Sequence, residues 1–164
     1  MNTFVIRRHA NWIVALTYIV ALLLTIWPLP DWGEPFRPDW LLIVTLYWCL
    51  FLPQRVGLGI TFVAGLLMDA LTGGLLGEHA LALLVVAWVT LKLHLQLRVY
   101  SWWQQTIVVC VLALVYTFLL FWIDGMLGYT QGAFLRWMPV LITTVLWPWC
   151  QWLLASLQQR HQVS

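Results

Sequence analysis

The chain has 164 residues, of which 63% are hydrophobic and only 9% are charged, and its formal net charge is +2. Because a soluble domain carries about 25% charged residues, this composition excludes a separate water-soluble domain. The eight Lys and Arg residues are scattered and form no basic patch, which excludes a nucleic-acid-binding surface.

Six apolar stretches follow one another along the chain, and each is predicted to form a helix. A helix needs about 20 apolar residues to span the hydrocarbon core, and prolines and glycines mark where these stretches end. The predicted helices cover residues 11–27, 40–52, 56–71, 79–95, 104–126 and 134–157. The second and third are short, which leaves two interpretations open: tilted spanning helices or a re-entrant hairpin. The expected fold class is all-α, a compact bundle of six transmembrane helices forming a single domain over residues 1–164.

The charged residues between these helices are sorted by sign. If the helices cross the membrane alternately, one side receives only basic residues: Arg7, Arg8, Arg55, Lys92, Arg98 and Arg160. The other side receives five acidic residues and two arginines: Asp31, Glu34, Asp39, Glu78, Asp124, Arg37 and Arg136. Basic connections stay in the cytoplasm. The sequence therefore predicts a multi-pass protein of the bacterial inner membrane with both termini in the cytoplasm.

One face of the third predicted helix combines small residues with a single acid. Gly57, Thr61, Gly65, Asp69 and Gly73 recur every four residues. Small residues at this spacing let two helices approach closely in lipid, and an acid within a membrane helix points away from lipid. Asp69 therefore has two interpretations. It caps the glycine turn or accepts hydrogen bonds from a neighbouring helix, or it binds a partner, a cation or a substrate, with Arg136 as the expected counter-charge.

The segment before the second predicted helix reads Phe36-Arg37-Pro38-Asp39-Trp40. Pro38 disfavours helical backbone at the preceding residue, so Arg37 is expected to be extended. The Asp39 carboxylate is expected to cap the helix, and Trp40 is expected to anchor it at the membrane interface. The alternative is that this segment is an exposed, rigid recognition loop.

Motifs for chemistry are absent from the sequence. It contains no phosphate-binding glycine loop, no zinc-protease or serine-hydrolase signature and no paired carboxylates at helical spacing. The three cysteines show no metal-ligand spacing. We therefore expect no enzyme activity, no cofactor and no metal. A small-solute-binding subunit of a membrane transporter remains the alternative function, although such carriers usually bury several polar groups at mid-membrane.

Several segments in order along the chain resemble the MreD family of rod shape-determining proteins. They are FRPDW at 36–40, LYW at 46–48, LPQRVGLG at 52–59, GLLMDALTGGLLG at 65–77, WWQQ at 102–105 and VLWPW at 145–149. The resemblance implies a non-catalytic subunit of the cell-elongation machinery that works with MreC, the MreB filament, RodA and its class B penicillin-binding protein. It also implies a helical bundle similar to the substrate-binding subunits of energy-coupling-factor transporters.

The leading hypothesis is a membrane scaffold that binds the transmembrane helix of MreC and helps to position or regulate peptidoglycan synthesis. Such a helix is expected to use the small-residue face of the third predicted helix. The residues expected to bind the partner are Gly57, Thr61, Gly65, Asp69, Gly73, Arg37, Asp39 and Trp40.

Overall fold

The structure is a computed structural model that describes residues 3–30, 33, 36–128 and 135–160. Asp31 and Glu34, which the sequence places in an acidic connection, lie outside these residues, as do the side chains of Arg7, Arg8 and Arg160. The described residues form six α-helices and no strand. The helices are α1 (Thr3–Ile26), α2 (Trp40–Phe51), α3 (Leu58–Thr72), α4 (Glu78–Leu97), α5 (Trp102–Leu127) and α6 (Met138–Arg160), with a short 3₁₀ helix η2 (Leu135–Trp137) before α6.

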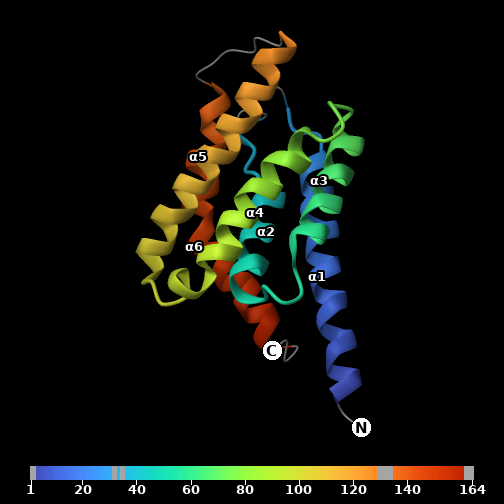
Figure 1. Ribbon diagram of the computed structural model, residues 1–164, viewed down its shortest axis with the longest axis vertical. Coiled ribbons are helices and arrows are strands. Elements are labelled where there is room, and N and C mark those ends of the chain that lie inside the picture. The colour runs from blue at the N-terminus through green and yellow to red at the C-terminus, as the bar shows by residue number, and fades with distance from the viewer. Residues whose placement is uncertain (1–2, 31–32, 34–35, 129–134, 161–164) are drawn as a thin grey trace.

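The helices run up and down in alternation along the long axis of the molecule (Figure 1). The start of α1 and the end of α6 lie at the same end of the bundle, together with the α2–α3 and α4–α5 connections. The α1–α2, α3–α4 and α5–α6 connections lie at the opposite end, which we call the distal end. This arrangement separates the two sets of connections that the charge pattern distinguished.

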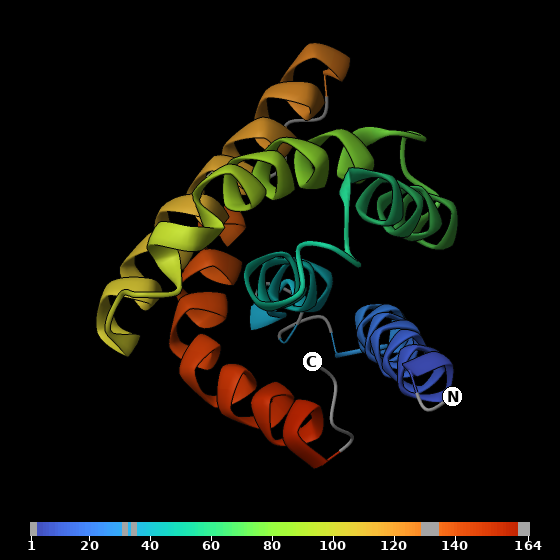
Figure 2. The ribbon, with the colours of Figure 1, turned by 60° about the horizontal axis from the view of Figure 1, so that its bottom comes forward.

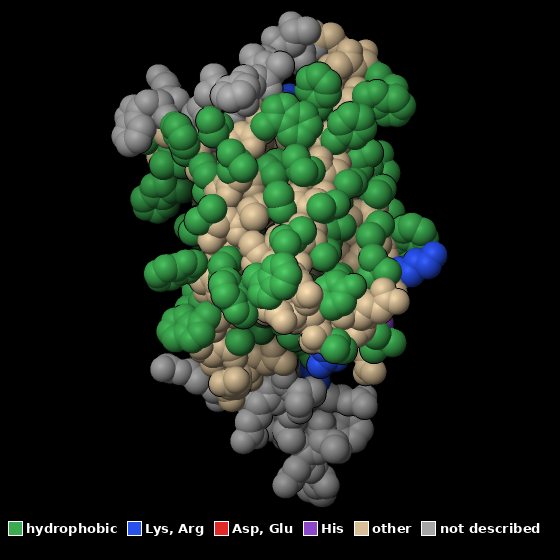
Figure 3. All heavy atoms as spheres, turned by 90° about the vertical axis from the view of Figure 1, so that its left-hand side faces the viewer, with side chains coloured by type: hydrophobic (Ala, Val, Ile, Leu, Met, Phe, Trp, Pro, Cys, Tyr) green, Lys and Arg blue, Asp and Glu red, His purple; other side chains and the backbone are tan. Residues whose placement is uncertain are grey.

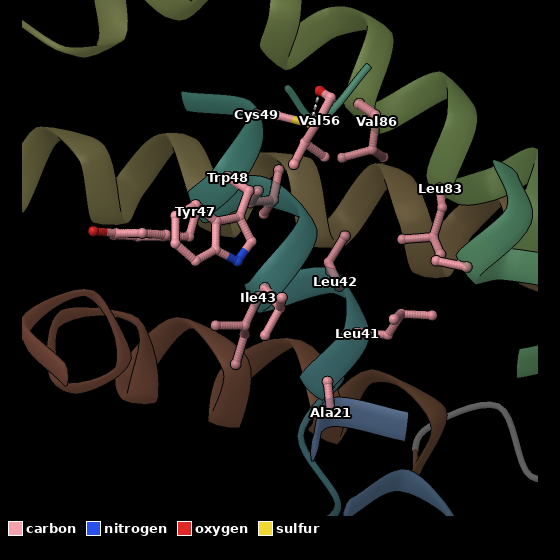
Figure 4. Close-up of a cluster of buried hydrophobic side chains, with 14 of the residues drawn as sticks. Ala21, Leu41, Leu42, Ile43, Tyr47, Trp48, Cys49, Val56, Leu83 and Val86 are labelled. Atoms are coloured by element: carbon pink, nitrogen blue, oxygen red, sulfur yellow. Dashed lines mark hydrogen bonds between the residues drawn. The ribbon is translucent and has the colours of Figure 1, made fainter. Parts of the chain in front are cut away.

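Helix α2 is the centre of the bundle. It packs against α1, α4 and α6, and Figure 2 shows it inside the ring of the other helices, with α5 on the outer side of α4 and α6. All ten residues from Leu41 to Leu50 are buried, so this helix is covered on every side. A helix that is apolar all round is expected in such a position. Trp48 is fully buried, and its indole nitrogen donates a 2.9 Å hydrogen bond to the Thr17 hydroxyl of α1. Figure 4 shows part of this core, where side chains of α2 meet Ala21 of α1 and Leu83 and Val86 of α4.

The outside of the bundle is apolar. Figure 3 shows one face covered almost entirely by hydrophobic side chains, with Lys or Arg side chains only at its edges. On α5 the exposed side chains include Ile107, Val111, Phe118 and Trp122, each at least half exposed. An exposed apolar surface of this extent indicates contact with lipid. The structure therefore confirms the predicted all-helical membrane fold.

The helix lengths bear on the number of crossings. Within the described residues, three helices are by length and composition able to cross a membrane: Glu78–Leu97, Trp102–Met126 and Met138–Gln159. Three shorter apolar helices accompany them: Trp12–Ile26, Trp40–Phe51 and Leu58–Thr72. Six crossings therefore remain a prediction.

The observed helix starts differ from the predicted ones by one or two residues in α3, α4 and α5, and by more in α1 and α6. Helix α1 starts at Thr3 rather than Asn11, because polar residues end an apolar stretch without ending the helix. Helix α6 starts at Met138 rather than Phe134. Pro139 lies in its first turn, where the missing N–H is not needed.

Candidate functional site

The distal end holds the polar side chains that the sequence singled out, with Asp69 as the most extensively bonded. Its carboxylate is completely buried and accepts hydrogen bonds from the backbone N–H of Gly77 (2.8 Å), His79 (3.0 Å) and Ala80 (3.4 Å). It also pairs with the ring nitrogen Nδ1 of His79 at 2.8 Å. The residue at the N-cap of α4 is Gly77, which has no side chain. Asp69 of α3 therefore supplies the cap that α4 lacks, which is the structural interpretation of this acid.

The prediction that Arg136 is the counter-charge of Asp69 is wrong. Arg136, which follows the α5–α6 connection, forms an ion pair with Asp124 at the end of α5. Glu78 interacts electrostatically with both members of this ion pair, and only 8% of its surface is exposed. His79, the residue after Glu78, pairs with Asp69, ten residues earlier in the chain. The turn between α3 and α4 brings these two residues together.

The small-residue face of α3 packs mainly inside the molecule. A Cβ atom at Gly65 would lie 2.4 Å from the Cα of Ala80 in α4, so the two backbones are in direct contact. Thr61 is fully buried, and its hydroxyl donates to the Gly57 carbonyl at 3.2 Å. Gly73 ends α3 with a φ of +69°, a conformation that favours glycine. At Gly65 the groove expected for a partner helix is therefore filled by α4 of the same chain, whereas Gly57 has open space around it.

The segment before α2 caps the end of α1 instead of the start of α2. The two terminal nitrogens of Arg37 donate to the carbonyls of Thr25 and Trp27, the latter at 2.7 Å. The expected cap by Asp39 is wrong, since its carboxylate makes no cap hydrogen bond, although its backbone N–H donates to the Thr143 hydroxyl of α6 at 3.0 Å. Trp40 is partly buried against the core, and its anchoring at the membrane interface stays a prediction.

Arg37 and Asp39 line a cavity of about 240 Å³ at the distal end, which we call the distal chamber. Its other polar residues come from three helices: Thr25 of α1, Thr72 of α3 and Tyr116 of α5. Apolar side chains of α2, α3 and the α6 start complete the wall. Burial raises the pKa of the Asp39 carboxyl to about 7. Tyr116 is the residue that sequence reasoning missed, because one tyrosine within an apolar helix gives no signal of its own.

A second hollow lies between α1 and α3 on the side of the bundle. This lateral groove has a volume of about 750 Å³, and its walls are mainly apolar. Three small residues line it, namely Ala15, Gly59 and Ala64. A Cβ atom added at Gly59 would meet nothing within 4 Å. The lateral groove is thus open where the small-residue face toward α4 is closed.

Within the described ranges, no group of three or more His, Cys, Asp or Glu side chains is arranged to hold a metal ion. What the distal end offers is hydrogen bonding and charge, and what the lateral groove offers is apolar surface.

The comparisons with known proteins agree with the resemblance. The family model described as rod shape-determining protein MreD matches residues 6–157. A relative from Haemophilus influenzae named "Rod shape-determining protein MreD" is 31% identical over 158 residues, which cover 94% of this chain and 96% of the relative. No solved structure matches, so the likeness to energy-coupling-factor subunits stays a prediction. This family consists of shape-determining structural proteins not known as enzymes. The chain belongs to the MreD family of rod shape-determining proteins.

Proposed function

We propose that this protein is a scaffold of the cell-elongation complex in the bacterial inner membrane, and that the lateral groove receives the transmembrane helix of MreC. Through that contact it would help to position or regulate peptidoglycan synthesis by RodA and its class B penicillin-binding protein, in connection with the MreB filament. Membership of the MreD family supports the role in rod shape, and the open groove is the observation that carries the binding site.

The lateral groove offers a partner helix more room than the small-residue face of α3 that was first expected to bind it. In lipid, helices associate through close packing at small residues, and Ala15, Gly59 and Ala64 leave that space on α1 and α3. Neighbouring side chains such as Val14, Ile60 and Val63 supply apolar walls. The α4-facing glycine, Gly65, cannot contribute because its space is occupied.

The orientation supports the same assembly. Most basic residues belong to the connections at the end where α1 begins, whereas the distal end carries acidic residues together with Arg37 and Arg136. By the positive-inside rule the distal end faces the periplasm and both termini face the cytoplasm. Reporter fusions at the C-terminus and in the α5–α6 connection test this; a periplasmic C-terminus would contradict it.

The decisive experiment is co-purification with MreC from mild detergent. Gly59→Leu places a large side chain in the lateral groove from a position where an added Cβ meets nothing within 4 Å, and we expect it to lower the recovery of MreC about tenfold, equivalent to about 1.4 kcal/mol. Gly125→Leu is the matched control, because Gly125 lies in α5, away from the groove, and also has open space. Equal recovery of MreC with both variants would remove the groove from consideration.

A further inference from the structure

The distal chamber contains polar groups that the fold itself leaves unsatisfied. The Asp39 carboxylate has no hydrogen-bond partner and no ion pair among the described residues. Tyr116 is only 1% exposed, and its hydroxyl likewise bonds to no described residue. Asp39 itself is only partly buried, so its carboxylate can pair only with water or with a ligand that enters the chamber.

The two threonine hydroxyls of the chamber already donate their hydrogens to backbone carbonyls. The Thr25 hydroxyl donates to the Ala21 carbonyl at 2.8 Å, and the Thr72 hydroxyl donates to the Met68 carbonyl at 2.9 Å. What these two hydroxyls can still offer is an oxygen that accepts. With the two Asp39 carboxylate oxygens, the free acceptor oxygens of the chamber outnumber its free donors, which are the Tyr116 hydroxyl and Arg37 Nε.

The positive charge of Arg37 does not cancel this excess. Both of its terminal nitrogens are bonded to the last carbonyls of α1, where the helix dipole concentrates negative charge. Only Nε is left without a partner. The negative charge of Asp39 is therefore the one in the chamber that nothing in the described chain pairs with.

We propose that the distal chamber binds a small ligand with a primary ammonium group, which donates hydrogen bonds to the Asp39 carboxylate and to the Tyr116 and threonine oxygens. An ammonium group brings three donors and one positive charge, which matches the acceptors and the unpaired acid. The chamber is too large for a bare ion, and Leu41, Leu42 and Met68 in its wall provide contact for a short carbon chain. The ammonium has two possible sources: a free amino compound, or the ethanolamine headgroup of a phospholipid.

Thermal unfolding of the full chain in detergent, followed by tryptophan fluorescence, tests the proposal. Ethanolammonium chloride is the probe, sodium chloride at equal ionic strength controls for charge, and ethylene glycol controls for size. A ligand that binds only the folded state raises Tm with concentration. We expect this rise with ethanolammonium alone. No rise, or an equal rise with sodium, would overturn the proposal.

Variants locate the effect. Asp39→Asn keeps the shape of the side chain and removes its charge, so the ethanolammonium-dependent rise should disappear. Tyr116→Phe removes one acceptor and should reduce the rise. Asp124→Asn, which alters the acid paired with Arg136 outside the chamber, should leave it intact. If ethanolammonium still raised the Tm of Asp39→Asn, the assignment would be overturned. The same would follow if it still raised the Tm of the unchanged protein at a pH low enough to protonate the Asp39 carboxyl.

Nanodiscs separate the two sources. If the ligand is the lipid headgroup, the unchanged protein should melt higher in phosphatidylethanolamine than in phosphatidylglycerol, and Asp39→Asn should remove that difference. If the ligand is a free amine, the rise should follow added ethanolammonium in either lipid. No Asp39-dependent difference in any of these arms would overturn the proposal.

Discussion

Gly65 on α3 and Ala80 on α4 touch backbone to backbone, with only 2.4 Å between an ideal Cβ at position 65 and the Ala80 Cα. Asp69 lies four residues further along α3 and so on the same face, one helical turn away. The close approach at Gly65 therefore brings the Asp69 carboxylate within reach of the first N–H groups of α4. One glycine contact and one carboxylate together hold the α3–α4 pair.

Replacing this glycine should destabilise the protein. Gly65→Ala places a methyl group against backbone that cannot rotate away, and we expect a loss of about 2 kcal/mol, typical of overpacking. Gly59→Ala is the control on the same helix; because its added methyl meets nothing, it should be neutral or gain up to about 1 kcal/mol. Unfolding in detergent measures both. Equal stabilities would contradict the close contact.

Asp39 should make the stability depend on pH. Its folded pKa, about 7, lies above its ordinary value of 3.8, so the folded state holds this proton to higher pH than the unfolded chain does. The contribution is greatest below about pH 4, declines by at most about 1.4 kcal/mol per pH unit, and levels off above about pH 7. Asp39→Asn stays neutral and should abolish this decline.

The measurement is the difference in Tm between the unchanged protein and Asp39→Asn at several pH values. The other charged groups at the distal end, such as Glu78 and Asp124, are the same in both proteins, so their contributions largely cancel. The same holds for Arg37 and Tyr116, which share the chamber with Asp39. A constant difference from about pH 5 to about pH 8 would show that the carboxyl is solvated or paired.

The helices were predictable from sequence because a long apolar stretch in lipid must satisfy its own backbone hydrogen bonds, and a helix does so. Helix α2 shows the limit of that rule. Its twelve residues are apolar on every side, so the pattern could not tell a short lipid-facing helix from one buried at the centre. Only the positions of the other helices around it decide between them.

The site was predictable in part. Asp69 was singled out because an acid inside an apolar helix is costly, and that cost is met by α4. Its partners and the pairing of Arg136 depend on which helix ends meet in space, and spacing along one helix carries no such information. Gly65 was assigned to a partner helix for the same reason: small-residue spacing indicates close packing without saying which helix packs there.

A cross-helix hydrogen bond in the core offers a second test of packing. Trp48 donates to the Thr17 hydroxyl at 2.9 Å, so Thr17→Val leaves a buried indole N–H without a partner, and we expect a loss of about 1–2 kcal/mol. Thr90→Val is the control, because the fully buried Thr90 bonds only within its own helix, to the Val86 carbonyl. Unfolding that is equally affected by both changes would show that the indole contact contributes nothing specific.

Removing the Asp69 carboxylate should have a larger effect than any other single change at the distal end. Asp69→Ala leaves the backbone N–H groups of Gly77, His79 and Ala80 and the His79 ring without their acceptor, and we expect a loss of about 3 kcal/mol or more. Asp69→Asn keeps one acceptor oxygen and should lose about 1–2 kcal/mol. The ion pair of Asp124 and Arg136 is partly exposed, so Asp124→Asn should cost less than about 1 kcal/mol.

Comparing cell shape with the amount of folded protein in the two Asp69 variants separates a capping role of Asp69 from a role in partner binding. Because Asp69 is buried and fully engaged within the chain, loss of rod shape should follow loss of folded protein in the membrane. Cell shape and the amount of folded protein should therefore fall together from Asp69→Asn to Asp69→Ala. If Asp69→Asn abolished rod shape while the protein stayed folded at its normal level, the charge itself would be acting on a partner and the capping role would be insufficient.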